Sequence, residues 1–223
     1  MSTDRQSKAD SRTPSRAPNR LDRRKALTRA ALIAAAQGFL AEQGRTDVSI
    51  QEITEAADVG FGSFYNHFTS KDELFDAAVA LTLEQHGELL ESVAGDLEDP
   101  AEIFAASVRL TGRLQRTHPQ IARILVRTGM PYLTSDEGLA PRAMRDLRAA
   151  ADSGRLDIDD PRTSVAMVGG ALLGVLHLLE TRPDLDAEHV SDQLAFRLLH
   201  MFGMTRAEAR AVATRPLPPP PRT

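Results

Sequence analysis

The sequence predicts an all-α protein, with a small N-terminal helical domain followed by a larger helical body. Alanine, leucine and arginine are abundant, whereas aromatic residues make up 4% of the 223 residues and tryptophan is absent, a composition that favours helices. Apolar residues recur at helical spacing behind a series of capping residues. No stretch alternates in the manner of a β-strand, and no internal repeat is visible.

Charge is distributed unevenly along the chain. The net charge is −4, but residues 1–71 contain 11 basic and 8 acidic residues, so this part carries +3 and the remainder carries −7. A basic front joined to an acidic body suits a polyanionic partner at one end of the molecule.

Several kinds of site are not expected. The chain has no cysteine, which excludes a disulfide framework and a thiolate metal site. Its six histidines form no HxH or HxxxH pair, so we expect neither a metal nor another cofactor. A P-loop, a GxSxG motif and an HExxH motif are all missing, and we therefore do not expect an enzyme.

The same reasoning predicts a cytoplasmic protein with no membrane partner. The N-terminus lacks the apolar segment of a secretory signal. The longest apolar run, Val165 to Leu179, contains His177 and is shorter than the ~18 residues of a membrane-spanning helix. We expect this run to form a buried helix.

The N-terminal domain is predicted to cover residues 23–83, behind a disordered basic segment of residues 1–22. Its first helix begins at Arg23 or Arg24 and ends at Gln43, where Gly44 is placed for a C-terminal cap. Its last helix begins at Ser70, continues to about Val93 and is ended by Gly95 and Asp96. The expected inward face of this last helix consists of Leu74, Phe75, Ala78 and Leu81.

Two short helices and a tight turn fit residues 49–68. Ser49 and Glu52 form a capping box at the start of the first, and residues 58–60 form the turn. The second helix is expected from Phe61 to Phe68, with Phe64 and Phe68 packed inward because they are four residues apart. Polar residues then cover its free face, which is the helix-turn-helix arrangement that reads DNA in the major groove.

This stretch resembles the DNA-binding domain of the TetR family of transcriptional regulators. The resemblance covers about residues 24–80 and rests on Gly44, Ser49, the pair Ala56–Ala57, Val59 and the segment Gly62-Ser63-Phe64-Tyr65-Asn66-His67-Phe68 followed by Ser70-Lys71. It implies a transcriptional regulator with a C-terminal domain that binds an effector and forms the dimer. That domain would span residues 84–214, before a proline-rich tail at 215–223.

The resemblance also implies roles for individual residues. Tyr65, His67, Lys71 and Ser49 match positions that contact phosphates, and the basic segment of residues 1–22 is either a solvated tail or an arm that contacts DNA. Gln51, Phe61, Ser63 and Asn66 match positions that face base edges. The expected DNA-binding set is Ser49, Gln51, Phe61, Gly62, Ser63, Tyr65, Asn66, His67 and Lys71.

One part of the motif departs from the family pattern. Gly60 and Phe61 stand where the family often has a polar cap followed by a basic or polar residue. Phe61 could therefore pack against the first helix instead of meeting a base. In the same way, Tyr65 and His67 could simply cover the surface of the domain.

The body is expected to contain helices separated by proline, glycine and aspartate signals. Asp99 and Asp160 each precede a proline, and Asp186 is a third N-cap. Residues 129–132 are expected to break a helix, and residues 134–138 to form a loop. The expected helices span residues 100–117, 119–128, 140–153, 161–179 and 187–202, with a short one beginning after the capping box at 205–208.

A two-fold, pseudo-palindromic operator requires a homodimer, and the helices at 161–181 and 187–202 are its expected interface. The glycines there permit close helix approach, either between subunits or within one subunit. The residues named for this interface are Gly170, Gly174, Leu194, Leu198 and Phe202.

A small-molecule effector of unknown identity is expected in the body, with a lipophilic molecule as the default. A residue of each of these types is more often ordinary core or surface than part of a pocket, and His177 fits a core histidine better than a ligand contact. The candidates are Phe104, Val108, Arg113, Ile121, Leu125, Arg127, Tyr132, Met167 and His177.

The most economical hypothesis is a sequence-specific repressor that a small molecule releases from its operator. The alternatives are an activator, or an effector-independent structural or division-linked DNA-binding protein with the same head. A ligand-sized pocket and loss of DNA binding on adding a ligand would separate these hypotheses.

Overall fold

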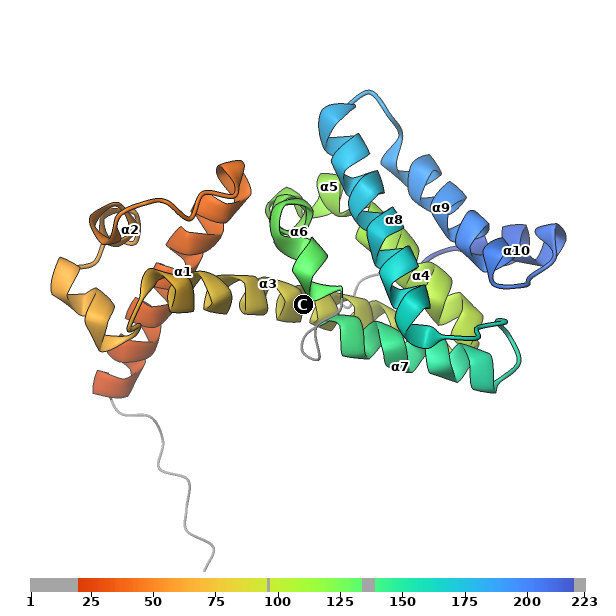
Figure 1. The fold of residues 1–223 in the computed structure, drawn as a ribbon, viewed down its shortest axis with the longest axis horizontal. Helices are drawn as coiled ribbons and strands as arrows, with labels where there is room; N and C mark the ends of the chain where they lie inside the picture. The colour runs from red at the N-terminus through yellow and green to blue at the C-terminus, as the bar shows by residue number, and fades with distance from the viewer. Residues whose placement is uncertain (1–19, 96, 134–138, 219–223) are drawn as a thin grey trace, which may run out of the picture.

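The computed structural model describes residues 20–95, 97–133 and 139–218, and every regular element in these ranges is helical (Figure 1). The all-α fold class is confirmed. The elements in chain order are α1 (Arg20–Gln43), α2 (Ile50–Ala56), the 3-10 helix η1 (Phe61–Asn66), α3 (Lys71–Ala94), α4 (Pro100–Gly112), α5 (Leu114–Thr117), α6 (Pro119–Tyr132), α7 (Leu139–Asp152), α8 (Pro161–Thr181), α9 (Ala187–Met201) and α10 (Arg206–Ala213).

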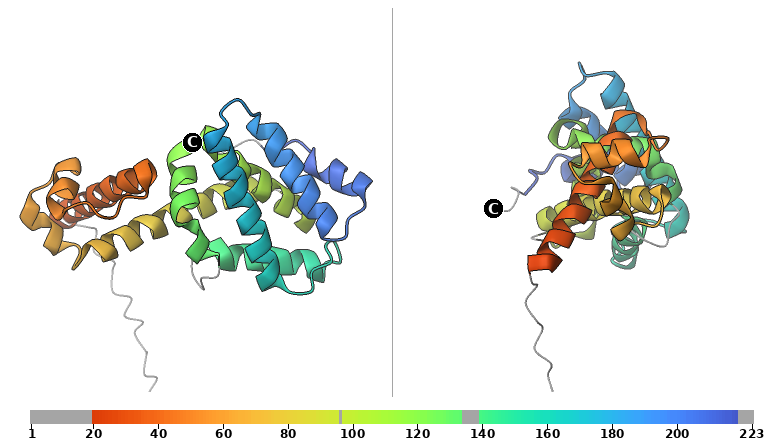
Figure 2. Two further views of the ribbon diagram at one scale, coloured as in Figure 1. Left: turned by 45° about the horizontal axis from the view of Figure 1, so that its top comes forward. Right: turned by 90° about the vertical axis from the view of Figure 1, so that its left-hand side faces the viewer.

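The molecule has a head at one end and a body at the other. The head contains α1, α2, η1 and the first half of α3, and α3 then continues into the body formed by α4 to α10 (Figures 1 and 2). α6 lies against both α1 and α8, so the head and the body meet at a second place besides α3.

The head is built around a core of large apolar side chains. Leu32, Ile53 and Phe64 are all completely buried in it. Ser49 forms the expected capping box with Glu52 at the start of α2. Gly44 follows α1 with φ +67° and donates its N–H to Leu40 O at 2.9 Å, which is the left-handed C-terminal cap that glycine adopts without strain.

The second helix of the head differs from its prediction. It is a 3-10 helix that ends at Asn66, not a two-turn α-helix that reaches Phe68. Its cap residue is Gly60, whose lack of a side chain leaves the first turn without a side-chain hydrogen bond. The two phenylalanines still pack together, with the ring centroids of Phe64 and Phe68 6.1 Å apart.

One face of α3 also differs from the prediction. Leu74 and Ala78 are buried as expected, but Leu81 is exposed. The buried line instead continues at steps of four residues through Thr82 and His86, because residues four apart stack on the same side of a helix. Leu81 therefore lies off this line.

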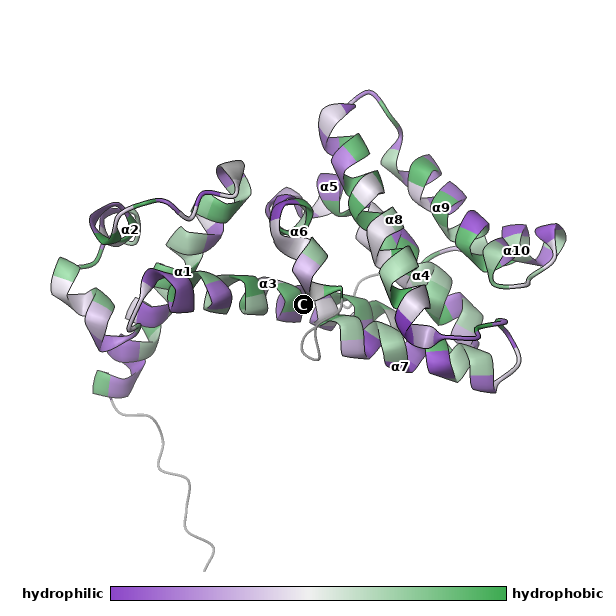
Figure 3. Ribbon diagram, in the orientation of Figure 1, coloured by the Kyte–Doolittle hydropathy of each residue, from purple (hydrophilic) through white to green (hydrophobic). Residues whose placement is uncertain are grey.

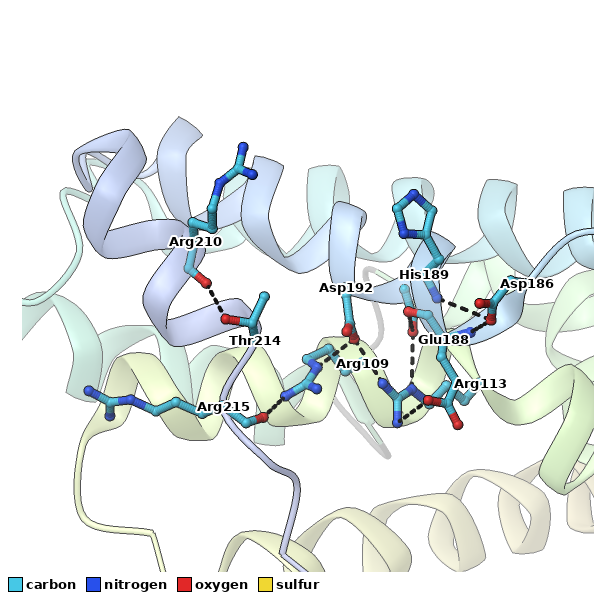
Figure 4. A network of polar contacts seen from close by, with 10 residues as sticks. Arg109, Arg113, Asp186, Glu188, His189, Asp192, Arg210, Thr214 and Arg215 are labelled. Atoms are coloured by element: carbon cyan, nitrogen blue, oxygen red, sulfur yellow. Dashed lines mark hydrogen bonds and ion pairs between the residues drawn. The ribbon is translucent and has the colours of Figure 1, made fainter.

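The body is fastened by a polar clamp between α4 and α9 (Figure 4). Asp192 accepts hydrogen bonds from Arg109 Nε at 2.7 Å and from Arg113 Nη2 at 2.8 Å. The helices come so close that a Cβ atom on Gly112 would lie 2.7 Å from Ser191 Cβ. Below this clamp lies a second core, in which Phe104 and Phe202 meet edge to face.

Three predicted helix boundaries need correction, two in the body and one in the head. The helix predicted over 100–117 is divided at Arg113, whose N–H bonds back to Arg109 O and Leu110 O. The predicted break at 129–132 is absent, because α6 continues through Pro131 to Tyr132. The first helix begins at Arg20, so the predicted N-terminal segment lies outside the described residues except for its last three positions.

Two other predictions fall on residues outside the description. These are the loop at residues 134–138 and the last five positions of the proline-rich tail.

The apolar helix α8 is only partly buried, contrary to the prediction of a buried helix. By length and composition α8 could cross a membrane, but it packs against α6, α7 and α9 of the body. Only 28% of its most apolar 18-residue window is buried. Met167 and Leu178 are 48% and 41% exposed, and the hydropathy-coloured ribbon shows how much of α8 is apolar (Figure 3).

Candidate DNA-binding surface and ligand pocket

The outer face of η1 is the most prominent surface of the head. Phe64 is buried and anchors the element, whereas Phe61 and Tyr65 are 54% and 59% exposed. Gly62 and Asn66 are exposed beside them, and Ser63 is half-buried. Phe61 therefore does not pack in the core below α1; its ring instead meets the edge of Tyr65, with the centroids 6.2 Å apart.

α2 presents Ser49 and Gln51 near this surface, but both side chains already have partners. The Ser49 hydroxyl donates to Glu52 Oε2 at 2.8 Å, and the hydrogen bonds from Ser49 lower the pKa of the Glu52 carboxyl. Gln51 Nε2 donates to Glu55 Oε1 at 2.9 Å. Reading a base with Gln51 would require an exchange of this exposed hydrogen bond.

Lys71 connects two parts of the head. It occupies the first position of α3, and its ammonium group donates to Val48 O at 2.7 Å, on the loop before α2. An ammonium group has three N–H donors, so this contact leaves Lys71 able to bind an anion as well.

His67 is half-buried at the end of η1, close to the basic side of α1. Burial lowers the pKa of its imidazole, and the charges of Lys25 and Arg29 lower it further. The Nδ1 atom is buried and has no hydrogen-bond partner among the described residues. Sequence reasoning named His67 but missed Lys25 and Arg29. These two cations add positive charge beside η1, and their spacing of four along α1 was the available signal.

The body encloses a pocket of about 360 Å³ between α3, α4, α6, α7 and α8. This volume is in the range of small-molecule sites. Most of the lining is apolar, and it includes three of the predicted pocket residues, Phe104, Val108 and Leu125. The polar lining residues are His86, Ser107, Thr111, Glu91, Arg142, Arg145 and Asp146.

The other predicted pocket residues lie elsewhere. Arg113 belongs to the clamp with Asp192 (Figure 4), and Arg127 pairs with Glu180 at 3.0 Å. Ile121 packs against the core shared by the head and α6. Met167 and His177 are exposed, so His177 is not a core histidine in this chain, and the side chain of Tyr132 lies outside the description.

Two pocket residues with distinctive chemistry were missed from the sequence. His86 is 1% exposed, and Arg142 has a buried guanidinium nitrogen without a hydrogen-bond partner among the described residues. A signal for His86 existed, because Thr82 and His86 continue the four-residue spacing of the buried face of α3. No comparable signal existed for Arg142, since α7 contains several arginines and only packing distinguishes them.

The residues named for a dimer interface fall into two groups. On α8, a Cβ atom added to Gly170 or Gly174 would meet nothing within 4 Å. On α9, Leu194 is half-buried, while Leu198 and Phe202 are each only 5% exposed. Leu198 and Phe202 thus point into the core of their own subunit.

The described part of the chain contains no group of three or more histidine, aspartate, glutamate or cysteine side chains that could hold a metal ion.

Two family models match the chain. Residues 32–78 match the model described as bacterial regulatory proteins of the tetR family, and residues 99–215 match the tetracyclin repressor-like C-terminal domain. The second match alone covers more than half of the chain.

Individual relatives agree with these models. The transcriptional repressor KstR2 of Mycobacterium tuberculosis is 28% identical over 97 residues, which cover 42% of this chain and 47% of KstR2. The repressor DhaR of Mycobacterium sp. strain GP1 is 40% identical over 89 residues, 40% of each protein. The chain thus matches less than half the length of these curated relatives.

A solved structure extends the likeness over nearly the whole chain. RolR in complex with the ligand resorcinol is 32% identical, with a TM-score of 0.63, and the match covers 89% of this chain and 99% of RolR. TetR-family proteins are DNA-binding transcription factors, not enzymes, and this chain belongs to the TetR family of transcriptional regulators.

Proposed function

We propose that this protein is a cytoplasmic, dimeric repressor that a small molecule in the body pocket releases from its operator. The observation that carries this proposal is that α3 both bears the DNA-binding head and lines the pocket. The relatives support the proposal too, since KstR2 and DhaR are named repressors and RolR was solved with resorcinol bound.

On the DNA side, η1 is the element proposed to enter the major groove. We assign base-edge contacts to Phe61, Ser63 and Asn66 of η1 and to Gln51 of α2, and Gly62 would lie at the same surface. The phosphate contacts are proposed for Ser49 at the start of α2, for Tyr65 and His67 in and just after η1, and for Lys71 at the start of α3.

The dimer interface is proposed on the exposed face of α8, with α9 beside it. A large apolar surface on a soluble chain marks an interaction site, and α8 has such a surface. Two helices from each subunit would bury it in a four-helix arrangement. The proposed interface includes four exposed residues, which are Met167, Gly174 and Leu178 on α8 and Met201 on α9.

Signal transfer is proposed to run through α6 as well as α3. Leu125, Gly129 and Leu133 of α6 line the pocket. On the side that faces the head, Arg127 lies against Gly44, with Arg127 Cβ 3.4 Å from the position of an added glycine Cβ. A ligand that shifts α6 would therefore push on the end of α1. Such coupling requires that the ligand bind the released state more tightly than the DNA-bound state.

The test is footprinting of the DNA upstream of the protein's own gene, at two salt concentrations. We expect protection of a pseudo-palindrome that weakens as salt rises, because phosphate contacts release counterions. Added resorcinol or a related compound should then abolish protection. Salt-sensitive binding without a protected site would instead favour an effector-independent role in DNA organisation.

A further inference from the structure

The pocket contains a buried histidine whose tautomer is fixed by its neighbours. Thr111 Oγ1 donates its single hydroxyl proton to Ser107 O at 2.8 Å. The same oxygen lies 3.0 Å from His86 Nε2, and it can take part in that contact only as an acceptor. His86 therefore carries its proton on Nε2, and Nδ1 is a bare hydrogen-bond acceptor.

This acceptor has no donor. His86 Nδ1 is buried and has no partner among the described residues, although the side chain lines the pocket. The side chain is 1% exposed, and burial lowers its pKa to about 4, so the ring is neutral near pH 7. A buried acceptor without a donor is costly, and this cost is relieved by a ligand group that donates a hydrogen bond.

Arg142 supplies the complementary atom. Its Nη2 donates to Glu84 at 2.7 Å, and its Nε lies 3.2 Å from Glu91, while Nη1 is buried with no acceptor in the described part of the chain. The guanidinium fits against α3 only because residue 87 is glycine, since a Cβ there would lie 2.0 Å from Nη1. An unfilled donor thus lies directly beside the residue that follows His86.

The charges at the pocket wall select against an ionic ligand. Arg145 lies 3.8 Å from Glu91 and 3.2 Å from Asp146, and Arg142 shares Glu91. Both cations that line the pocket therefore already face carboxylates, and His86 is neutral. A ligand carboxylate would lose its hydration here without gaining a free positive partner.

We propose that the pocket binds a neutral, mostly apolar molecule that carries hydroxyl groups, with one O–H donated to His86 Nδ1 and an oxygen accepting from Arg142 Nη1. Phenols and small alcohols have this chemistry. The inference rests on the proposed ligand-binding role of the body, but it does not require that the ligand control DNA binding.

The test is calorimetric titration of the full-length protein without DNA. The probes are resorcinol, its dimethyl ether 1,3-dimethoxybenzene, which has the oxygens but no donor, and benzoate, which has a charge. We expect resorcinol to bind roughly tenfold or more tightly than the ether and than benzoate, because a site built for a hydroxyl rejects analogues that lack it. Phenol and cyclohexanol are included so that the class does not depend on one compound.

Two variants assign the contacts. His86→Phe should remove most of the preference of the protein for resorcinol over the ether, whereas His189→Phe, the same change on the exposed surface of α9, should keep it. Gly87→Ala should displace Arg142 and weaken resorcinol binding several-fold. Gly38→Ala, where an added Cβ meets nothing within 4 Å, is its control. If His86→Phe fails to fold, the proposal is still tested by Gly87→Ala and by the relative affinities of the wild-type protein for resorcinol, the ether and benzoate.

Three outcomes would overturn the proposal. They are equal binding of the ether and resorcinol, tighter binding of benzoate, and no binding by any hydroxyl compound, which would leave water as the partner of His86. A separate gel-shift titration tests the regulatory step. Hydroxyl-dependent binding without release of DNA would preserve this inference and contradict the effector-released repressor.

Discussion

At the scale of single residues, the candidate site in the head consists of exposed side chains, whereas the pocket in the body contains a buried polar side chain. Tyr65 and Phe61 are exposed on a short element whose neighbour Phe64 is completely buried, so the core fixes the position of the surface side chains. His86 is a polar side chain held inside, where its hydrogen-bonding capacity is only half used. The exposed rings on η1 are thus accessible to DNA, and the Nδ1 atom of His86 is left to accept a hydrogen bond from a ligand.

Tyr65→Phe is expected to weaken DNA binding about equally for all sequences, because it removes a proposed phosphate contact. Binding titrations on the operator and on a scrambled duplex measure this effect. A change in which base pairs are preferred would show that the role assigned to Tyr65 is wrong.

Phe61→Ala is expected to alter base preference and to leave thermal stability nearly unchanged, because the side chain is 54% exposed. Selection of binding sites from a random pool, together with a melting curve, measures both effects. An unchanged preference combined with a lower melting temperature would place Phe61 among the residues that hold the head together.

His86 should make stability depend on pH. Burial lowers its folded-state pKa to about 4, whereas an unfolded histidine titrates near 6.5. Between these values the unfolded chain binds more protons, so the stabilising effect is complete above about pH 6.5 and is lost as the pH falls toward 4. The loss is on the order of 3 kcal/mol.

Urea unfolding at a series of pH values checks this prediction. The carboxylates with lowered pKa also lose stability at low pH, so the informative quantity is the difference between the wild type and His86→Phe. That difference should change between pH 6.5 and 4 and stay constant above pH 6.5. A difference that does not vary with pH would mean that His86 has the same pKa in the folded protein as in the unfolded chain.

At the scale of elements, the helix starts that carry a side-chain cap were predicted correctly. The capping boxes at Ser49 and Thr205 are both present, and so are the aspartate caps of α4, α8 and α9. Side-chain caps act locally, so sequence alone determines them. The 3-10 form of η1, by contrast, was not predicted.

Gly44→Ala tests the cap of α1. Alanine at φ +67° is strained, and we expect a loss of about 1–2 kcal/mol in the free energy of unfolding. Gly38→Ala inside the same helix is the control and should gain about 1 kcal/mol or slightly less, because alanine is the better helix former. Urea unfolding of both variants measures the two effects. Equal effects of the two substitutions would contradict the special role of Gly44.

At the scale of the whole molecule, the proposed regulation would depend on two surfaces that lie away from the candidate DNA-binding face. The pocket lies between α3 and the body helices, and the apolar face of α8 lies on the outside. A head that reads DNA needs a second copy at a fixed spacing, and the proposed dimer would supply it.

Leu178→Glu is expected to give a monomer and to weaken operator binding strongly, because it places a charge on the proposed interface. Met130→Glu replaces another exposed apolar residue, on α6, and should leave the dimer intact. Light scattering behind size exclusion measures the mass of each variant. A dimeric Leu178→Glu protein would place the interface elsewhere.

The sequence by itself determined the helical class, most helix ends, the buried pair Phe64 and Phe68, and the resemblance of residues 49–71 to a DNA-binding motif. These follow from local signals, namely capping residues, spacings of three and four, and a contiguous motif. The candidate DNA-contact residues come from this contiguous motif, and their contacts with DNA stay predictions.

Only the tertiary structure decided the composition of the pocket and the direction in which α9 faces. Three of the nine predicted pocket residues line it, while His86 and Arg142 were missed. Nothing in the sequence distinguishes Arg113, Arg127 and Arg142. In the structure, Arg113 pairs with a carboxylate on α9 and Arg127 with a carboxylate on α8. Of these three arginines, Arg142 alone lines the pocket. Such pairings join residues more than 50 positions apart, and no local pattern encodes which arginine faces which helix.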